Sequence, residues 1–233
     1  MSRDTQHVLL ALLGGALLRI AADGTYLRYV RPDHRWLLIT AGVAMVVLAV
    51  VGIVADRRGD GHRDHGEHDH GGAERRAPWL LLAPVLVLAL VAPPALGADA
   101  VARSPGAVVR DADVFAPLPP GDAPALPVAE FVQRAAWDST GSLDGREVSL
   151  TGFVVRHGAA TELARMSIAC CAADARPHRV RLAGDLPALP ADTWIRVRGV
   201  LQGGSATTAT GYVPAMTVTG VEVVAAPPDP YEY

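Results

Sequence analysis

The residues with the clearest metal-binding chemistry are two neighbouring cysteines, Cys170 and Cys171, followed closely by Asp174 and His178. Thiolate, imidazole and carboxylate groups are the ligands that zinc takes in proteins. We therefore expect these four residues to form a metal site with zinc as its ion, although their spacing matches no standard zinc motif. Two other interpretations stay open: the cysteines only fill space at the end of a strand, or one thiol is a nucleophile with His157 or His178 as its base.

The peptide bond between the two cysteines limits how they can pair. Neighbouring α-carbons lie about 3.8 Å apart, which is less than the roughly 4.4–6.8 Å that most disulfides need. A disulfide between Cys170 and Cys171 would therefore be strained. Neighbours on a strand point to opposite faces, so we expect one thiol to enter the core and the other to face outward or into the next loop.

A second set of metal ligands lies in the acidic, glycine-rich segment 59–72. Neutral imidazole binds zinc, copper and nickel, and carboxylates can complete the coordination shell. Glycine disfavours both helix and strand, so we expect a flexible loop that gathers metal with low affinity; the alternative is a solvated connector without a ligand. The histidines of this loop are His62, His65, His68 and His70.

Three apolar runs, residues 8–22, 36–55 and 79–98, precede the cysteine region. A helix needs about 20 apolar residues to cross the bilayer core, so we expect three transmembrane helices in a membrane domain 1–98. A cleaved signal peptide is the alternative for the first run. Arginines gather at both ends of the 59–72 loop, and arginine-rich loops stay in the cytoplasm. This pattern predicts a multi-pass protein of the cell membrane with an extracytoplasmic C-terminal domain.

The rest of the chain is typical of a tether followed by a soluble β domain. Residues 99–126 are rich in proline and alanine and predict an extended linker. The domain 127–233 begins with an amphipathic helix and continues with alternating segments that predict five strands. Glycines inside these strands indicate bulges or sharp coiling. The predicted strands are 146–157, 162–171, 178–184, 192–204 and 212–225, and the mid-strand glycines are Gly152, Gly199 and Gly220. The expected fold is thus membrane-anchored α + β, with three transmembrane helices followed by a small OB-like Greek-key β-barrel.

Four stretches together resemble the YcgQ-like family of membrane permease subunits: "GFVVR" at 152–156, "RMSIACCAADA" at 165–175, "DTWIRVRGVL" at 192–201 and the terminal "PYEY". Members of that family have N-terminal membrane helices and a C-terminal domain of unknown function. The resemblance covers nearly the whole chain and implies a separate multi-span permease as the partner. It marks as family-motif residues Arg165, Cys170, Cys171, Asp174 and Ala175, and at the terminus Pro230, Tyr231 and Tyr233.

The net charge of −3 is mild, whereas a nucleic-acid binder is normally basic, so we expect no nucleic acid as a partner. Three helices are too few for alternating access, which uses repeated sets of helices. We therefore expect a non-enzymatic accessory subunit of a permease complex in the lipid bilayer. Its extracytoplasmic domain would capture a substrate, such as a metal ion, or dock on the permease. A stand-alone zinc-binding or redox-sensing membrane protein and a structural adaptor without a ligand are the alternatives.

Overall fold

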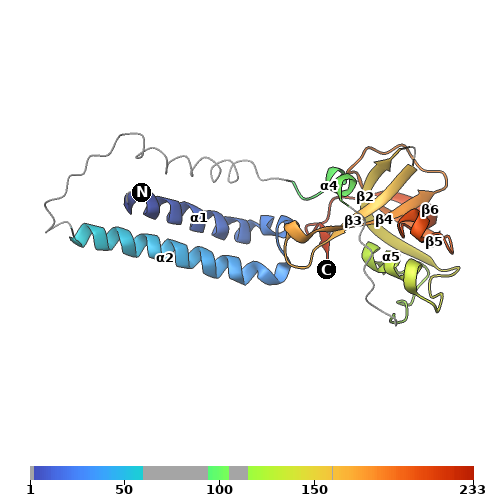
Figure 1. Cartoon of the computed structure of the whole chain (residues 1–233), viewed down its shortest axis with the longest axis horizontal. Helices are drawn as coiled ribbons and strands as arrows, with labels where there is room; N and C mark the ends of the chain where they lie inside the picture. The colour runs from blue at the N-terminus through green and yellow to red at the C-terminus, as the bar shows by residue number, and fades with distance from the viewer. Residues whose placement is uncertain (1–2, 60–93, 105–114, 159) are drawn as a thin grey trace. The chain divides into compact units, whose positions relative to one another are not determined.

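The computed structural model describes residues 3–59, 94–104, 115–158 and 160–233. The chain divides into two compact units, Met1–Pro94 and Ala95–Tyr233, which are drawn in Figure 1. Two expectations fall largely outside the described residues. The 59–72 loop is described only at Gly59, so its four histidines lie outside, and the third apolar run is described only from Pro94 onward.

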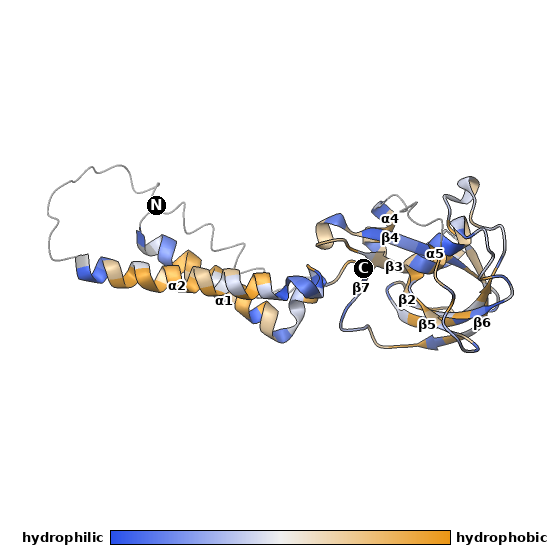
Figure 2. Cartoon of the chain, turned by 90° about the horizontal axis from the view of Figure 1, so that it is seen from below, coloured by the Kyte–Doolittle hydropathy of each residue, from blue (hydrophilic) through white to orange (hydrophobic). Residues whose placement is uncertain are grey.

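Two long helices make up the described part of the first unit, and both are long and apolar enough to cross a membrane. They are α1 (Arg3–Asp23) and α2 (Arg35–Gly59), joined through the short 3-10 helices η1 (Thr25–Arg28) and η2 (Pro32–His34). Apolar residues run along both helices, as the colouring of Figure 2 shows, and Leu12, Leu37 and Leu48 are among the exposed ones. The structure therefore agrees with two of the three predicted spans.

The two helices pack antiparallel at close range. A Cβ added to Gly14 of α1 would lie 2.7 Å from the carbonyl oxygen of Gly42 on α2, so a larger residue does not fit there. At one end of the pair, Arg3 and Asp56 form an ion pair of 3.1 Å. Glycine at the crossing thus permits the contact that holds the helix pair together.

The second unit is built on a sheet of seven described strands in the order β1-β2-β5-β6-β4-β3-β7. Its helices are α4 (Ala98–Arg103) and α5 (Val128–Trp137), with short 3-10 helices η4 (Ala172–Asp174) and η5 (Thr208–Thr210). Its strands are β1 (Ala125–Leu126), β2 (Glu147–His157), β3 (Ala160–Ser167), β4 (Arg176–Ala183), β5 (Trp194–Leu201), β6 (Ala215–Val223) and β7 (Tyr231–Glu232).

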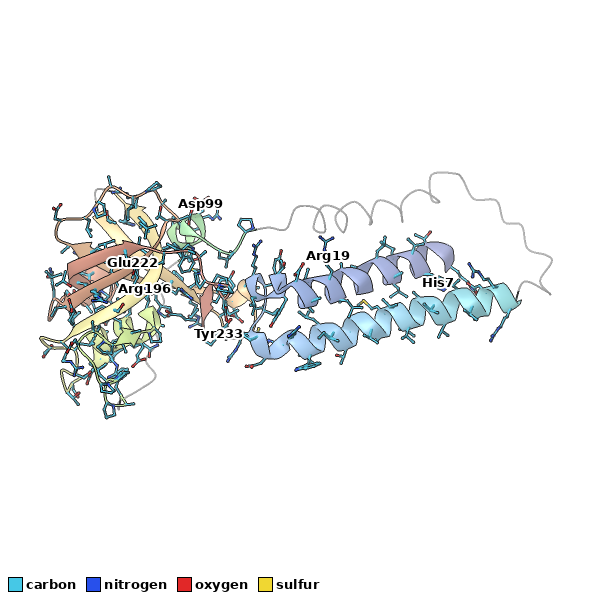
Figure 3. All side chains as sticks on the ribbon, turned by 180° about the vertical axis from the view of Figure 1, so that it is seen from behind. His7, Arg19, Asp99, Arg196, Glu222 and Tyr233 are labelled. Atoms are coloured by element: carbon cyan, nitrogen blue, oxygen red, sulfur yellow. The ribbon has the colours of Figure 1, made fainter. Side chains whose placement is uncertain are left out.

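The five longer strands correspond to the five strands predicted from the sequence. Strand β2 is antiparallel to both β3 and β5. Strand β5 is antiparallel to β6, β6 is parallel to β4, and β4 is antiparallel to β3. In the described residues each of these strands therefore has two long partners, and the pairings return to β2. An exposed ion pair of 3.1 Å between Arg196 and Glu222 lies across β5 and β6 (Figure 3).

Two of the mid-strand glycines allow strands to approach very closely. A Cβ at Gly152 of β2 would lie 2.4 Å from the carbonyl oxygen of Ala164 on β3. A Cβ at Gly199 would lie 2.4 Å from the carbonyl oxygen of Thr217, next to a register shift between β5 and β6. Gly220 differs, because an added Cβ there meets nothing within 4 Å. The predicted bulge is thus present in the strand at Gly199. At Gly152 the lack of a side chain instead lets β2 and β3 approach each other closely.

Two apolar clusters hold the second unit together. The main core joins the inner faces of the long strands to α5, whose Phe131 is fully buried. The second cluster contains Val101 of α4 together with Phe153, Met166 and Tyr231.

The segment 99–126 differs from the extended tether expected from its composition. Its beginning forms helix α4, because Val101 is buried in the second cluster, 1% exposed. Its end forms β1, which pairs in parallel with β2. Burial of apolar surface at both ends offsets the low intrinsic order of a proline-rich sequence.

Candidate functional site

The two cysteines lie in a loop between β3 and β4. Strand β3 ends at Ser167, so the predicted strand through Cys171 is too long by four residues. The strand ends early because the backbone that follows it is hydrogen-bonded to a side chain. The carboxylate of Asp174 accepts hydrogen bonds from the N–H groups of Ala169 at 2.7 Å, Cys170 at 2.9 Å and Cys171 at 3.2 Å. The strand alternation expected for the two thiols is therefore wrong, and their directions are set by this loop.

The side chain of Cys170 is hydrogen-bonded to the same carboxylate. Its thiol donates a hydrogen bond of 2.8 Å to Oδ2 of Asp174. This hydrogen bond, followed by the backbone N–H donors, lowers the pKa of Asp174 to about 2. The same bond, together with one to Cys171, raises the pKa of the exposed Cys170 thiol to about 11. At neutral pH Asp174 is therefore ionised and accepts a hydrogen bond from the protonated thiol of Cys170.

Three potential metal ligands come together in this loop. Among the described residues, Cys170, Cys171 and Asp174 form the one group of three or more such side chains whose ligand atoms all lie within 4.8 Å of one another. Both cysteines are free thiols; Cys170 is exposed and Cys171 is half-buried. The loop can thus be reached from solvent and offers two sulfur atoms and a carboxylate.

The separation of the two sulfur atoms suits tetrahedral zinc. They lie 3.7 Å apart, and two Zn–S bonds of about 2.3 Å at a tetrahedral angle place their sulfurs about 3.8 Å apart. The contact of 2.8 Å between Cys170 and Asp174 is shorter than the roughly 3.6 Å expected between a sulfur and an oxygen on one zinc ion. The carboxylate must therefore move outward when the thiol proton is replaced by a metal.

His178, the fourth expected ligand, is not part of this group. It lies on β4, is 3% exposed, and its Nε2 is 2.8 Å from the hydroxyl oxygen of Ser167 on the neighbouring strand. Burial, and then the positive charge of Arg176, lower the pKa of His178 to about 4, so the ring is neutral at pH 7. The structure thus places this histidine in the interior beside Ser167, whereas the three other residues share the loop.

The nucleophile interpretation has little support in this geometry. An activated cysteine has a lowered pKa and a base within hydrogen-bond reach. The pKa of Cys170 is raised instead, and its hydrogen-bond acceptor is a carboxylate. His157 is exposed at the end of β2, and His178 is hydrogen-bonded to Ser167.

The remaining family-motif residues have structural contacts of their own. Arg165 is buried; its guanidinium donates to the carbonyl of Asp229 at 3.0 Å and lies 4.7 Å from the ring centre of Trp194. Ala175 packs against the second apolar cluster. Pro230 and Tyr231 are buried, and the exposed Tyr233, labelled in Figure 3, donates its hydroxyl to Asp229. None of these residues contributes a ligand atom to the group.

Glu232 is a residue of this region that sequence reasoning missed. Its carboxylate accepts the N–H groups of Val128 at 2.7 Å and Ala129 at 2.8 Å, which begin helix α5. Burial raises its pKa, opposed by these two hydrogen bonds. Its backbone carbonyl accepts the N–H of Ile168 at 3.0 Å, directly before the cysteine loop. Its place between the two tyrosines of the terminal motif was the available signal.

Comparison with known proteins identifies the family of the chain but gives no information on the chemistry of the site. No curated protein and no solved structure matches the chain. Two family models match it, one in each half of the chain. The chain carries both domains of the DUF1980 family, the N-terminal domain over residues 5–104 and the C-terminal domain over residues 135–233.

Proposed function

We propose that this chain is a membrane-anchored metal-capture subunit. Its apolar helices hold it in the bilayer, and its C-terminal domain binds a thiophilic divalent ion, with zinc as the leading candidate, through Cys170, Cys171 and Asp174. The observation that carries the proposal is the gathering of these three ligand atoms within 4.8 Å on an accessible loop. Two sulfurs and one oxygen suit zinc better than magnesium or calcium, which prefer shells made of oxygen alone.

The three-ligand set suits an ion that is taken up and released. Structural zinc sites in proteins are closed by four protein ligands, whereas a site with three leaves one position for water or another molecule. An exposed Cys170 lets an incoming ligand reach the metal. The open position is where a ligand from a second protein would enter during transfer.

A separate permease is the proposed partner. Two described helices, or three with the 79–98 run, are too few to form a pathway with alternating access. The resemblance to permease subunits points the same way. In this proposal the membrane domain is multi-pass, and the C-terminal domain is extracytoplasmic, where it meets the ion before the permease does. Co-purification of a multi-span protein from native membranes is the expected result.

The fold of the C-terminal unit supports a binding role. We propose that the circuit of pairings β2-β5-β6-β4-β3-β2 is a five-stranded Greek-key barrel of the OB type, because β2 pairs with both β3 and β5 and the parallel pair is β4 with β6. Such a barrel presents ligands on loops fixed by a rigid core. The four histidines of the 59–72 loop would then form a separate, weaker metal-gathering segment on the cytoplasmic side.

Calorimetric zinc titration of the full-length, reduced protein in detergent micelles tests the proposal. Replacement of His62, His65, His68 and His70 by alanine removes the loop contribution, and in that background we expect one remaining zinc equivalent. Cys171→Ser and Asp174→Asn should each weaken it. Asp185→Asn, a change at an exposed aspartate outside the loop, is the matched control and should leave it intact. Absence of any zinc binding in the histidine-free background would refute the proposed capture site.

A further inference from the structure

We infer that the β7 segment, residues 229–233, positions the cysteine loop, so that docking of this segment and binding of the metal are coupled. The segment holds the loop in the shape that brings Cys170, Cys171 and Asp174 together. The coupling rests on the proposed function, because it concerns zinc at the same site. The positioning can be measured without metal, so the two ideas can fail separately.

The β7 segment binds the backbone at the point where the cysteine loop begins. Ile168 follows directly after β3 and is 3% exposed. Its N–H donates to the backbone carbonyl of Glu232 at 3.0 Å. The N–H groups of the next three residues donate to the carboxylate of Asp174. Four successive backbone donors are therefore hydrogen-bonded, the first to the β7 segment and the other three to a ligand of the site.

The β7 segment and the cysteine loop also share the second apolar cluster. Tyr231 and Ile168 are both part of it, and each is 3% exposed. Ala172 and Ala175 pack against the same cluster from further along the loop. Removal of the tyrosine ring would therefore leave a cavity in the cluster that both ends of the loop contact.

Contacts with other elements fix the β7 segment in place, so it can support the loop. Its backbone pairs in parallel with the end of β3, and both strands are labelled in Figure 2. The carboxylate of Glu232 accepts the N–H groups of Val128 and Ala129 at the start of α5. The carbonyl of Asp229 accepts a hydrogen bond of 3.0 Å from the guanidinium of Arg165 on β3. The segment is thus anchored to one helix and one strand, independently of the cysteines.

Two states of the loop connect the β7 segment to the metal. In the closed state the segment is docked and the three ligand atoms lie together; in the open state the segment has left β3 and the ligand atoms have separated. Zinc binds the closed state better, because only that state offers all three ligands at once. A ligand shifts such an equilibrium through its different affinities for the two states. Binding of zinc and docking of the segment must therefore strengthen each other by the same factor.

Hydrogen–deuterium exchange of the zinc-free, reduced chain in detergent micelles tests the positioning. We expect Tyr231→Ala to accelerate exchange in the loop, residues 168–175, several-fold, because the cavity loosens the residues that pack on the ring. Tyr231→Phe is the matched control. It keeps the ring and loses only the hydroxyl that accepts the N–H of Leu96, so exchange in the loop should stay as it is in the unchanged chain.

Helix η5 reports whether a change is local to the loop. Its capping hydrogen bonds run between Thr207 and Thr210 and involve neither the loop nor β7. In Tyr231→Ala, exchange in η5 should therefore stay unchanged while exchange in the loop accelerates. Loop exchange that stays unchanged in Tyr231→Ala would overturn the inference. Equal acceleration in η5 and in the loop would contradict it too, because the ring would then support the whole domain.

Zinc binding to the chain with an intact β7 segment provides a second measurement. In the background without the four loop histidines, we expect zinc to slow exchange in residues 224–233 by about fivefold or more, the lower end of typical coupling between two sites. Exchange in η5 should not change, and Cys171→Ser should remove the effect. Zinc that binds without slowing exchange in the β7 segment would overturn the coupling. A chain that binds no zinc contradicts the capture function, and the zinc-free comparison still decides whether the β7 segment holds the loop.

Discussion

A single carboxylate organises the candidate site. Asp174 fixes the loop backbone through three N–H groups and accepts a hydrogen bond from the thiol of Cys170. The pKa of that thiol, about 11, means that metal binding must release a proton at neutral pH. We therefore expect the affinity for zinc to rise with pH, by about tenfold per pH unit for each proton released, until the thiol ionises on its own.

Replacement of Asp174 by asparagine should lower the pKa of the Cys170 thiol. The change removes the charged acceptor that holds the proton, so the thiolate forms at lower pH. Alkylation of Cys170 by iodoacetamide, measured against pH in a Cys171→Ser background, should shift toward lower pH relative to the same background with Asp174 intact. Asp185→Asn should leave the profile where it is. An unchanged profile in Asp174→Asn would show that the carboxylate does not hold the proton.

The protonation of Asp174 also predicts the acid sensitivity of the loop. The pKa of Asp174 in the folded chain is about 2, below its ordinary value of 3.8. A lowered carboxylate pKa contributes stability that is fully present above the ordinary value and is lost as the pH falls through about 2. The loop is thus expected to stay ordered at every pH well above 2.

Residue types and spacing revealed much of this site but not all of it. The adjacency of Cys170 and Cys171 and the nearby Asp174 were visible in the sequence, because ligand chemistry depends on residue type. The exclusion of His178 was not visible. It depends on where β4 begins, because His178 is the third residue of that strand and its ring is buried beside Ser167.

Strand β2 illustrates how an element depends on one position. Gly152 allows β2 to approach β3 so closely that any Cβ would meet a backbone oxygen at 2.4 Å. We predict that Gly152→Ala destabilises the domain by about 1–3 kcal/mol, the usual cost of overpacking, because a backbone atom cannot rotate away. Chemical denaturation followed by tryptophan fluorescence measures the change.

Gly220 is the matched control for this prediction. It also lies within a long strand, but its surroundings are open. Gly220→Ala should be neutral or slightly stabilising, since alanine reduces the freedom of the unfolded chain. Equal destabilisation by both substitutions would contradict the packing explanation and point instead to a general cost of alanine in these strands.

The elements divide into those that local patterns predict and those that distant contacts create. Alternation predicted the five longer strands, and apolar length predicted α1 and α2. Strand β7 has two residues and helix α4 has six, too short for a periodic signal. Both exist because Tyr231 and Val101 are buried in the second apolar cluster, a contact between segments more than a hundred residues apart. Such a contact leaves no local trace in the sequence.

At the scale of the whole molecule, the described residues form an apolar helix pair and a β domain that begins immediately after Pro94. The composition of 99–126 suggested a spacer that would hold the domain away from the membrane. The burial of Val101 in helix α4 makes the first part of that segment a part of the domain.

X-ray absorption at the zinc K edge tests the central claim most directly. The sample is the reduced full-length protein with its four loop histidines replaced by alanine, loaded with one equivalent of zinc. The account predicts two sulfur neighbours at about 2.3 Å and oxygen neighbours at about 2.0–2.2 Å. A shell made only of oxygen and nitrogen atoms would contradict it, because the zinc would then be bound away from Cys170 and Cys171.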